Sequence, residues 1–164
     1  MIDRYRPHVL VLPEDDANRQ MANGFVLHPG VNSRTIQILD TAGGWASVVE
    51  YVKKDGNINH LRKFEQCRVV LLLDYDNQFP GRFDSICEKI PGDLRDRVYV
   101  LGVLSEPEEL KSDLKKPFEK IGNALASECC RDVQEVWQHP LLRHNHGELV
   151  RLIQDVKPFL FGNQ

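Results

Sequence analysis

Acidic residues follow two apolar segments of this sequence, each at the point where a β-strand is expected to end. The first segment is HVLVLP, residues 8–13, and the second is RVVLLLDYD, residues 68–76. The acids at these two places are Glu14, Asp15, Asp16, Asp74 and Asp76. Residues i and i+2 of a strand point to the same side, so Asp74 and Asp76 are expected to share one face. If the two strands are neighbours in a sheet, the two acidic groups converge.

Such a cluster is suited to holding a metal ion. Carboxylates that crowd together without partners repel one another and raise one another's pKa. A divalent cation removes that cost, and Mg²⁺ prefers a few carboxylate oxygens while it keeps several waters. The pattern therefore predicts a site for Mg²⁺ or Mn²⁺. The plainer alternative is that the acids belong to turns, or that Asp15 or Asp16 caps a helix.

A sheet predicted from the rest of the sequence would bring these acids into position. Strands are expected at residues 8–13, 34–40, 68–76 and 97–104. Helical patterns follow them at residues 14–25, 41–54, 83–90 and 105–114. The continuous apolar run in 68–76 is typical of a central parallel strand that is buried on both faces. The alternation predicts an α/β fold with a mostly parallel, four-stranded, Rossmann-like sheet, and sites in such sheets form outside the carboxyl ends of the strands.

Length and composition fit a single domain, residues 1–164. Hydrophobic residues make up 41% of the chain, and its net charge of −3 gives no sign of a strongly basic nucleic-acid-binding face. The core is expected at about residues 8–112, and a helical C-terminal extension at about 113–164 packs on the sheet or on a partner. No apolar run reaches the length of a membrane span, and the N-terminus lacks the pattern of a signal peptide. We therefore expect a cytoplasmic protein whose four cysteines are reduced.

The order of three motifs resembles the TOPRIM (topoisomerase–primase) domain, as found in overcoming-lysogenisation-defect nucleases. That family has a glutamate after its first strand, a glycine-containing turn after the second, and a DxD motif after the third. The matching residues are Glu14 in VLPEDD, Gly43 and Gly44 in AGGW, and Asp74 and Asp76 in DYD. Asp15 follows Glu14 where the family usually has a glycine. The resemblance covers about residues 8–112.

The resemblance implies a Mg²⁺-dependent phosphoryl-transfer enzyme that acts on nucleic acid, most simply a DNA-binding nuclease. Glu14 would be a metal ligand or the catalytic acid–base, and Asp74 and Asp76 would hold the metal. Further acids could be supplied by Asp15, Asp16, Glu106, Glu108 and Glu109. Gly43 and Gly44 could hold a phosphate at a helix N-terminus. A basic rim could be formed by Arg19, Arg34, Arg62, Lys63, Arg68 and Arg82.

The same acidic pocket also resembles the receiver domain of response regulators. In that case Asp74 would accept a phosphoryl group and Ser105 would occupy the position of the switch hydroxyl. The lysine would come from KKPF, residues 115–118. A receiver carries this lysine after a fifth strand, and KSDLKKPFEK is too charged to form one. The resemblance implies a signalling module rather than a nuclease.

Two further interpretations depend on other residues. A zinc site could draw on Cys129, Cys130, His139, His144 and His146. Their spacing matches no finger or catalytic zinc motif, so QHPLLRHNHGEL is better explained as a connection between helices, with Asn145 or His146 near a cap. The remaining alternative is an interaction protein that acts through a protein partner or as a homodimer, in which the acids are solvated turns.

Overall fold

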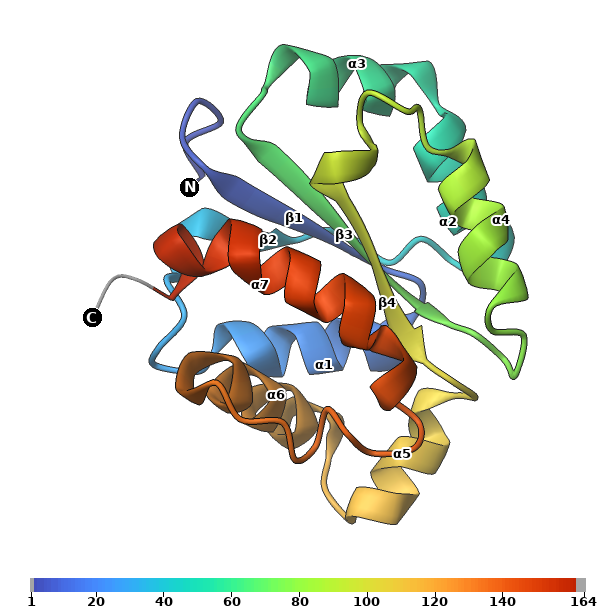
Figure 1. The fold of residues 1–164 in the computed structure, drawn as a ribbon, viewed down its shortest axis with the longest axis vertical. Coiled ribbons are helices and arrows are strands. Elements are labelled where there is room, and N and C mark those ends of the chain that lie inside the picture. Colours follow the sequence, from blue (N-terminus) through green and yellow to red (C-terminus); the bar gives the residue numbers. More distant parts are fainter. Residues whose placement is uncertain (1, 162–164) are drawn as a thin grey trace.

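A computed structural model describes residues 2–161 and contains, within that range, one four-stranded parallel sheet in the order β2-β1-β3-β4 (Figure 1). The elements are β1 (His8–Pro13), α1 (Asp16–Val26), β2 (Ile36–Ile38), α2 (Trp45–Lys53), α3 (Asp55–Lys63), β3 (Cys67–Asp74), α4 (Gly81–Lys89), β4 (Val98–Val103), α5 (Pro107–Leu114), α6 (Phe118–Arg131) and α7 (His146–Leu160). The predicted α/β class with a parallel sheet flanked by helices is confirmed.

Two helical layers cover the two faces of the sheet. Helices α1, α6 and α7 lie on one face, and α2, α3 and α4 lie on the other (Figure 1). Along β3, Val70 points into the first layer, whereas Leu71 and Leu73 are fully buried in the second. The prediction that this strand is central and buried on both faces is therefore correct.

Several boundaries differ from those expected. Strand β3 ends at Asp74, two residues before the predicted end. Strand β2 comprises only Ile36–Ile38 and follows a short 3₁₀ turn at Ser33–Thr35. The helical pattern in residues 41–54 forms α2 alone. Lys54 then adopts an extended backbone conformation, and α3, which the sequence did not predict, begins at the next residue. No helix within residues 2–161 is both long and apolar enough to cross a membrane.

The C-terminal helices are part of the same packed structure as the sheet. Helix α6 lies so close to α1 that their backbones touch. A Cβ atom added to Gly24 would lie 2.0 Å from the carbonyl oxygen of Glu119, and one added to Gly122 would lie 1.9 Å from that of Met21. Only glycine can occupy these two positions without separating the helices. Helix α7 covers the sheet beside them (Figure 1).

The outer edge of β4 has side chains where a fifth strand would normally pair. The amide of Asn145 accepts a hydrogen bond from the N–H of Gly102 and donates one to its carbonyl oxygen, both at 3.0 Å. Glu148 accepts from the N–H of Val100 at 3.0 Å. Two arginine side chains donate to the carbonyl oxygen of Val98. The backbone groups of this edge strand are thus satisfied without another strand, which prevents it from pairing with a second chain.

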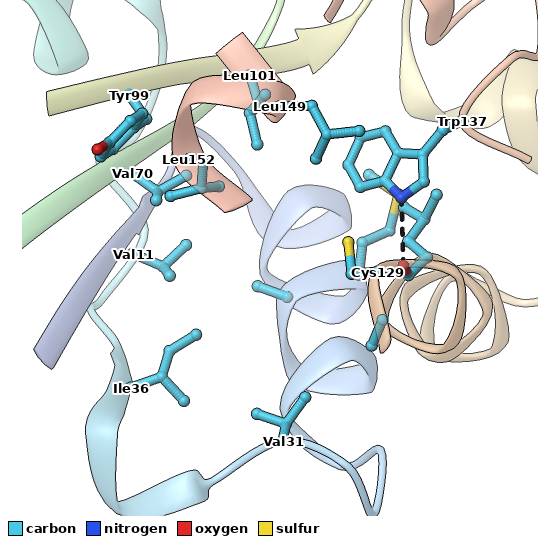
Figure 2. Close-up of a cluster of buried hydrophobic side chains, with 14 of the residues drawn as sticks. Val11, Val31, Ile36, Val70, Tyr99, Leu101, Cys129, Trp137, Leu149 and Leu152 are labelled. Carbon is cyan, nitrogen blue, oxygen red and sulfur yellow. Dashed lines mark hydrogen bonds between the residues drawn. The ribbon is translucent and has the colours of Figure 1, made fainter. Parts of the chain in front are cut away.

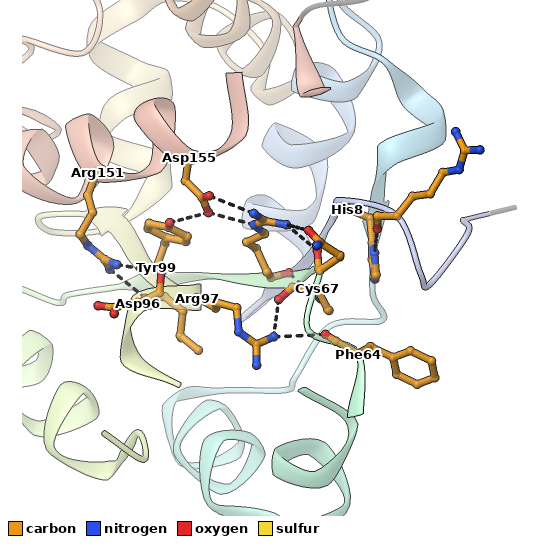
Figure 3. A network of polar contacts seen from close by, with 12 residues as sticks. His8, Phe64, Cys67, Asp96, Arg97, Tyr99, Arg151 and Asp155 are labelled. Carbon is orange, nitrogen blue, oxygen red and sulfur yellow. Dashed lines mark hydrogen bonds and ion pairs between the residues drawn. The ribbon is translucent and has the colours of Figure 1, made fainter. Parts of the chain in front are cut away.

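A polar network fixes α7 to the amino-terminal end of the sheet (Figure 3). The guanidinium of Arg68 donates two hydrogen bonds to the carboxylate of Asp155, each at 3.0 Å, and the hydroxyl of Tyr99 donates a third at 2.7 Å. Nearby, Arg97 donates to the carbonyl oxygens of Phe64 and Cys67. This network lies at the end of the sheet opposite to Glu14 and Asp74, because those residues follow or end their strands.

Candidate functional site

The acidic site is built where β1 and β3 end side by side. The N–H of Glu14 donates to the carbonyl oxygen of Leu72 at 2.8 Å, which continues the pairing of the two strands by one residue. Glu14 is only 7% exposed, and its Oε2 accepts a hydrogen bond of 2.6 Å from the backbone N–H of Asp74. The structure therefore brings together the acids that follow the first and third strands.

Asn18, which the sequence did not single out, connects the acids. Asp15 is the N-cap of α1, and its Oδ1 accepts from the backbone N–H of Asn18 at 3.0 Å. The side-chain amide of Asn18 also donates to Asp15 Oδ1 at 3.0 Å and to Asp74 Oδ1 at 2.9 Å. Asn18 is 2% exposed, so its amide has a fixed orientation that in turn orients the Asp74 carboxylate. An amide three residues after a helix cap is the signal that could have revealed it.

Burial and mutual repulsion disfavour the charged forms of these acids. Burial, together with the charges of Asp15 and Glu14, raises the pKa of Asp74 to about 7, although the hydrogen bond from Asn18 opposes this. The pKa of Glu14 is also raised, chiefly by burial, while the Asp74 amide and the Arg82 guanidinium oppose the shift. Arg82 therefore offsets only part of the cost of charging these acids, and a bound cation would relieve the rest.

The glycine turn borders the same pocket. Gly43 and Gly44 have φ angles of 99° and 133°, a region that side chains with a Cβ rarely adopt. The N–H of Gly43 donates to the backbone carbonyl oxygen of Glu14 at 3.0 Å. Helix α2 begins with the next residue, Trp45. The turn thus places the start of α2 beside Glu14, where the sequence predicted a phosphate-binding position.

Arg82 is the member of the predicted basic rim that lies at the pocket. Its Nη1 donates to the carbonyl oxygen of Asp74 at 2.9 Å, and its guanidinium lies over the Trp45 ring, 4.8 Å from the centroid. By contrast, Arg68 is engaged at the opposite end of the sheet by Asp155. Arg68 therefore does not belong to a rim at this end of the sheet. Arg62 is paired with Asp93, and Arg19 is paired with Asp16 at the start of α1.

Asp76 does not share a strand face with Asp74, contrary to the expectation from i and i+2 spacing. Strand β3 has ended, and Asp76 lies in an exposed turn with φ of 49°. Its charge nevertheless contributes to raising the pKa of Glu14. Asp16 is exposed and bonded to the side chains of Arg19 and Gln20. The other candidate acids are exposed at the start of α5, and they are Glu106, Glu108 and Glu109.

Few residues of the described chain could bind a metal ion directly. Within residues 2–161, no group of three or more His, Cys, Asp and Glu side chains is arranged to hold a metal ion. The zinc candidates are dispersed, with His139 paired to Asp113 and His144 bonded to the carbonyl oxygen of Gly102. Two carboxylates with water can still suit Mg²⁺, which rarely takes a complete ligand set from protein.

The receiver interpretation required Ser105 and a lysine of KKPF at the site, and only Ser105 lies there. The carbonyl oxygen of Ser105 accepts from the N–H of Asp76 at 3.0 Å, so Ser105 lies at this edge of the sheet. Its buried hydroxyl has no hydrogen-bond partner within the described residues. Lys115 and Lys116 instead follow α5, and the described chain has no fifth strand to carry them.

The fold and the site together define an α/β protein with a cluster of acidic residues at the carboxyl ends of its central strands. Comparison of the sequence and structure with protein-family models, curated proteins and solved structures returned no significant match. The chemistry of the pocket must therefore be inferred from its own residues.

Proposed function

We propose that this protein is a cytoplasmic, Mg²⁺- or Mn²⁺-dependent nuclease of the TOPRIM type, which binds the metal at Glu14 and Asp74. The observation that carries the proposal is the 2.6 Å hydrogen bond from the Asp74 amide to Glu14 Oε2, which holds two carboxylate residues together at the end of the sheet. The TOPRIM resemblance supplies the reaction class, and the order of the acids and the glycine turn supports it.

The donor chemistry of the pocket fits a hard divalent cation. Carboxylate oxygens are available from Glu14 and Asp74, and Asp15 lies close enough to raise the pKa of both. Mg²⁺ is held by one or two carboxylates and retains several waters. Asp76 and the acids at the start of α5 are exposed, so in this proposal they would contact the metal through its bound waters and not directly.

The residues of the pocket have distinct roles in this proposal. A bound Mg²⁺ would stabilise negative charge on the phosphate and lower the pKa of a bound water. Glu14, whose pKa is raised chiefly by burial, is the proton acceptor in this proposal. The guanidinium of Arg82, which lies over the Trp45 ring, supplies positive charge for a nucleic-acid phosphate. The chain's net charge of −3 requires that such contacts be local.

Thermal unfolding with and without Mn²⁺ or Mg²⁺ tests the metal site. At 100 times its dissociation constant a metal should stabilise the wild type by about 2.7 kcal/mol. The stabilisation should strengthen as the pH rises through about 7, because Asp74 must ionise to bind. Asp74→Ala should abolish it, whereas Asp16→Ala, which changes an exposed acid at the start of α1, should not. A wild type that Mn²⁺ and Mg²⁺ leave unchanged would refute metal binding.

Cleavage of DNA tests the reaction separately. We expect metal-dependent cleavage of single- or double-stranded DNA that is lost in Glu14→Gln, since glutamine keeps the hydrogen bond from Asp74 but cannot accept a proton. Metal binding without cleavage of DNA or RNA would leave a metal-binding module and reject the nuclease.

A receiver-like phosphoacceptor is the second candidate, favoured by the buried hydroxyl of Ser105 beside Asp76. Incubation with Mg²⁺ and acetyl phosphate should then label Asp74, and Asp74→Asn should prevent labelling. Labelling elsewhere, or none, would exclude this function. If both candidates fail, the pocket would serve an interaction module that acts through a protein partner or as a homodimer.

A further inference from the structure

An apolar cavity lies in the core between the sheet and the layer formed by α1, α6 and α7. Its volume is about 110 Å³. Figure 2 shows part of its wall, with Val11 and Val70 on the sheet, Leu149 and Leu152 on α7, and Trp137 beside Leu149. The cavity is distinct from the acidic pocket, although Asn18 contributes to the walls of both.

The surrounding elements are fixed in ways that keep this space from closing. Helices α1 and α6 touch through their backbones at Gly24 and Gly122, so they can approach the sheet only as one unit. Helix α7 is fixed to the sheet at both ends, by Asn145 near its start and by the Asp155 ion pair with Arg68 further along. Packed interiors relax only partially around missing volume when their walls are held in this way.

The wall offers little to water. Its polar side chains are already engaged, because Asn145 bonds to both backbone groups of Gly102 and the indole N–H of Trp137 donates to the carbonyl oxygen of Leu125. Burial raises the pKa of the Cys129 thiol to about 12, so this wall residue is uncharged. A buried water needs two to four polar partners, and apolar cavities of comparable size remain dry and accept small apolar molecules.

We propose that this cavity is a binding site for a small, neutral, apolar molecule about the size of one six-membered ring. Apolar contacts throughout the wall select against charge, and the volume of about 110 Å³ selects against anything larger. The site does not depend on the metal site or on the proposed nuclease activity. Its occupant would contact Asn18, the residue that orients the Asp74 carboxylate.

Binding of benzene to the full chain tests the proposal, with benzoate as a charged probe that carries the same ring. Benzene at 100 times its dissociation constant should increase the folded-to-unfolded ratio about a hundredfold and raise the melting temperature. In NMR spectra the indole N–H signal of Trp137 should shift, whereas that of Trp45, which lies outside the cavity wall, should not. Benzoate should produce neither effect. Absence of both effects with benzene, or an equal response at Trp45, would overturn the proposal.

A substitution that fills the cavity can be compared with one that adds the same volume elsewhere in the core. Ala22 lies in the wall, so Ala22→Leu should be tolerated and should abolish the benzene response. Ala126 is equally buried but outside the wall, so Ala126→Leu should overpack the core and lower the melting temperature. Benzene binding that persists in Ala22→Leu would place the ligand elsewhere and reject this site. If Ala22→Leu does not fold, the Trp137 and Trp45 signals of the wild type still decide the question.

Discussion

The carboxylate of Glu14 accepts a hydrogen bond from the backbone N–H of Asp74, with 2.6 Å between Oε2 and N. This bond satisfies the last amide of β3 with a side chain from the end of β1. We expect Glu14→Ala to destabilise the protein by about 1 to 3 kcal/mol, because the amide loses its partner in a buried place. Glu14→Gln should cost much less, since its amide oxygen can accept the same bond. Urea unfolding of both variants measures the difference, and equal losses would contradict it.

The ionisation of Asp74 should oppose folding at neutral and alkaline pH. Its pKa is about 7 in the folded protein and 3.8 as the ordinary value, so the folded state holds the proton more tightly. Stability is therefore lost as the pH rises from about 4 to about 7. Asp74→Asn should stabilise the metal-free protein at pH 8 by on the order of 2 kcal/mol and have little effect near pH 4. Chemical unfolding at both pH values checks this, with the exposed Asp76→Asn as control. If Asp74→Asn changed the stability equally at the two pH values, the ionisation of Asp74 would not be the cause.

His144 should make the protein sensitive to acid. Its Nε2 donates to the carbonyl oxygen of Gly102 at 2.7 Å, and its buried Nδ1 has no partner within the described residues. Burial lowers the pKa of the ring, so the unfolded chain gains the proton first and stability is lost as the pH falls below 6.5. His144→Phe should reduce that loss between pH 7 and pH 5, because Asn145 still donates to the Gly102 carbonyl. Unfolding midpoints across this range test it. The exposed His146→Phe should keep the wild-type pH dependence, and an unchanged dependence in His144→Phe would contradict the assignment.

The contact between α1 and α6 should tolerate no side chain at two glycines. Alanine at Gly24 or Gly122 would place a Cβ 2.0 or 1.9 Å from a backbone carbonyl oxygen, far inside van der Waals contact. Each substitution should lower stability by about 3 kcal/mol or more, because the obstacle is backbone that cannot rotate away. Gly147→Ala in α7, where the added Cβ meets nothing within 4 Å, should be neutral or slightly stabilising. Thermal melts of the three variants compare them directly. Wild-type stability in Gly24→Ala would show that the helices can separate without cost.

Three strands could be predicted from apolar runs, and β1 matches its predicted range at His8–Pro13. Strand β2 was predicted from the alternation of apolar and polar residues in RTIQILD, and its observed range is shorter. Helix α3 was not predicted, since DGNINHLRK has only Ile58 and Leu61 as large apolar residues and therefore no helical stripe to detect. The side chains that close the edge of β4 were also beyond prediction. Asn145 lies more than forty residues from Gly102 in the chain, and no local pattern marks that contact.

The candidate site was predictable only in part. Glu14 and Asp74 follow from strand ends, and neighbouring strands bring them together. The position of Asp76 depends on a left-handed turn, with φ of 49°, that no period-two pattern reveals. Arg68 and Arg82 are similar in sequence terms, yet Arg68 bonds to α7 at one end of β3, whereas Arg82 donates to the backbone carbonyl oxygen of Asp74 at the other end. Only the tertiary structure separates a structural cation from one at the site.

The closed edge of β4 has a consequence for how the chain is made. The residues that complete the edge, Asn145 and Glu148, are synthesised well after the strand that they cover. During synthesis β4 therefore leaves the ribosome as an apolar strand whose outer edge stays unpaired until α7 has also emerged. During that interval the backbone groups of the β4 edge lack the side-chain partners that Asn145 and Glu148 provide in the folded protein. Docking of α7 is thus the folding step that closes the β4 edge of the sheet.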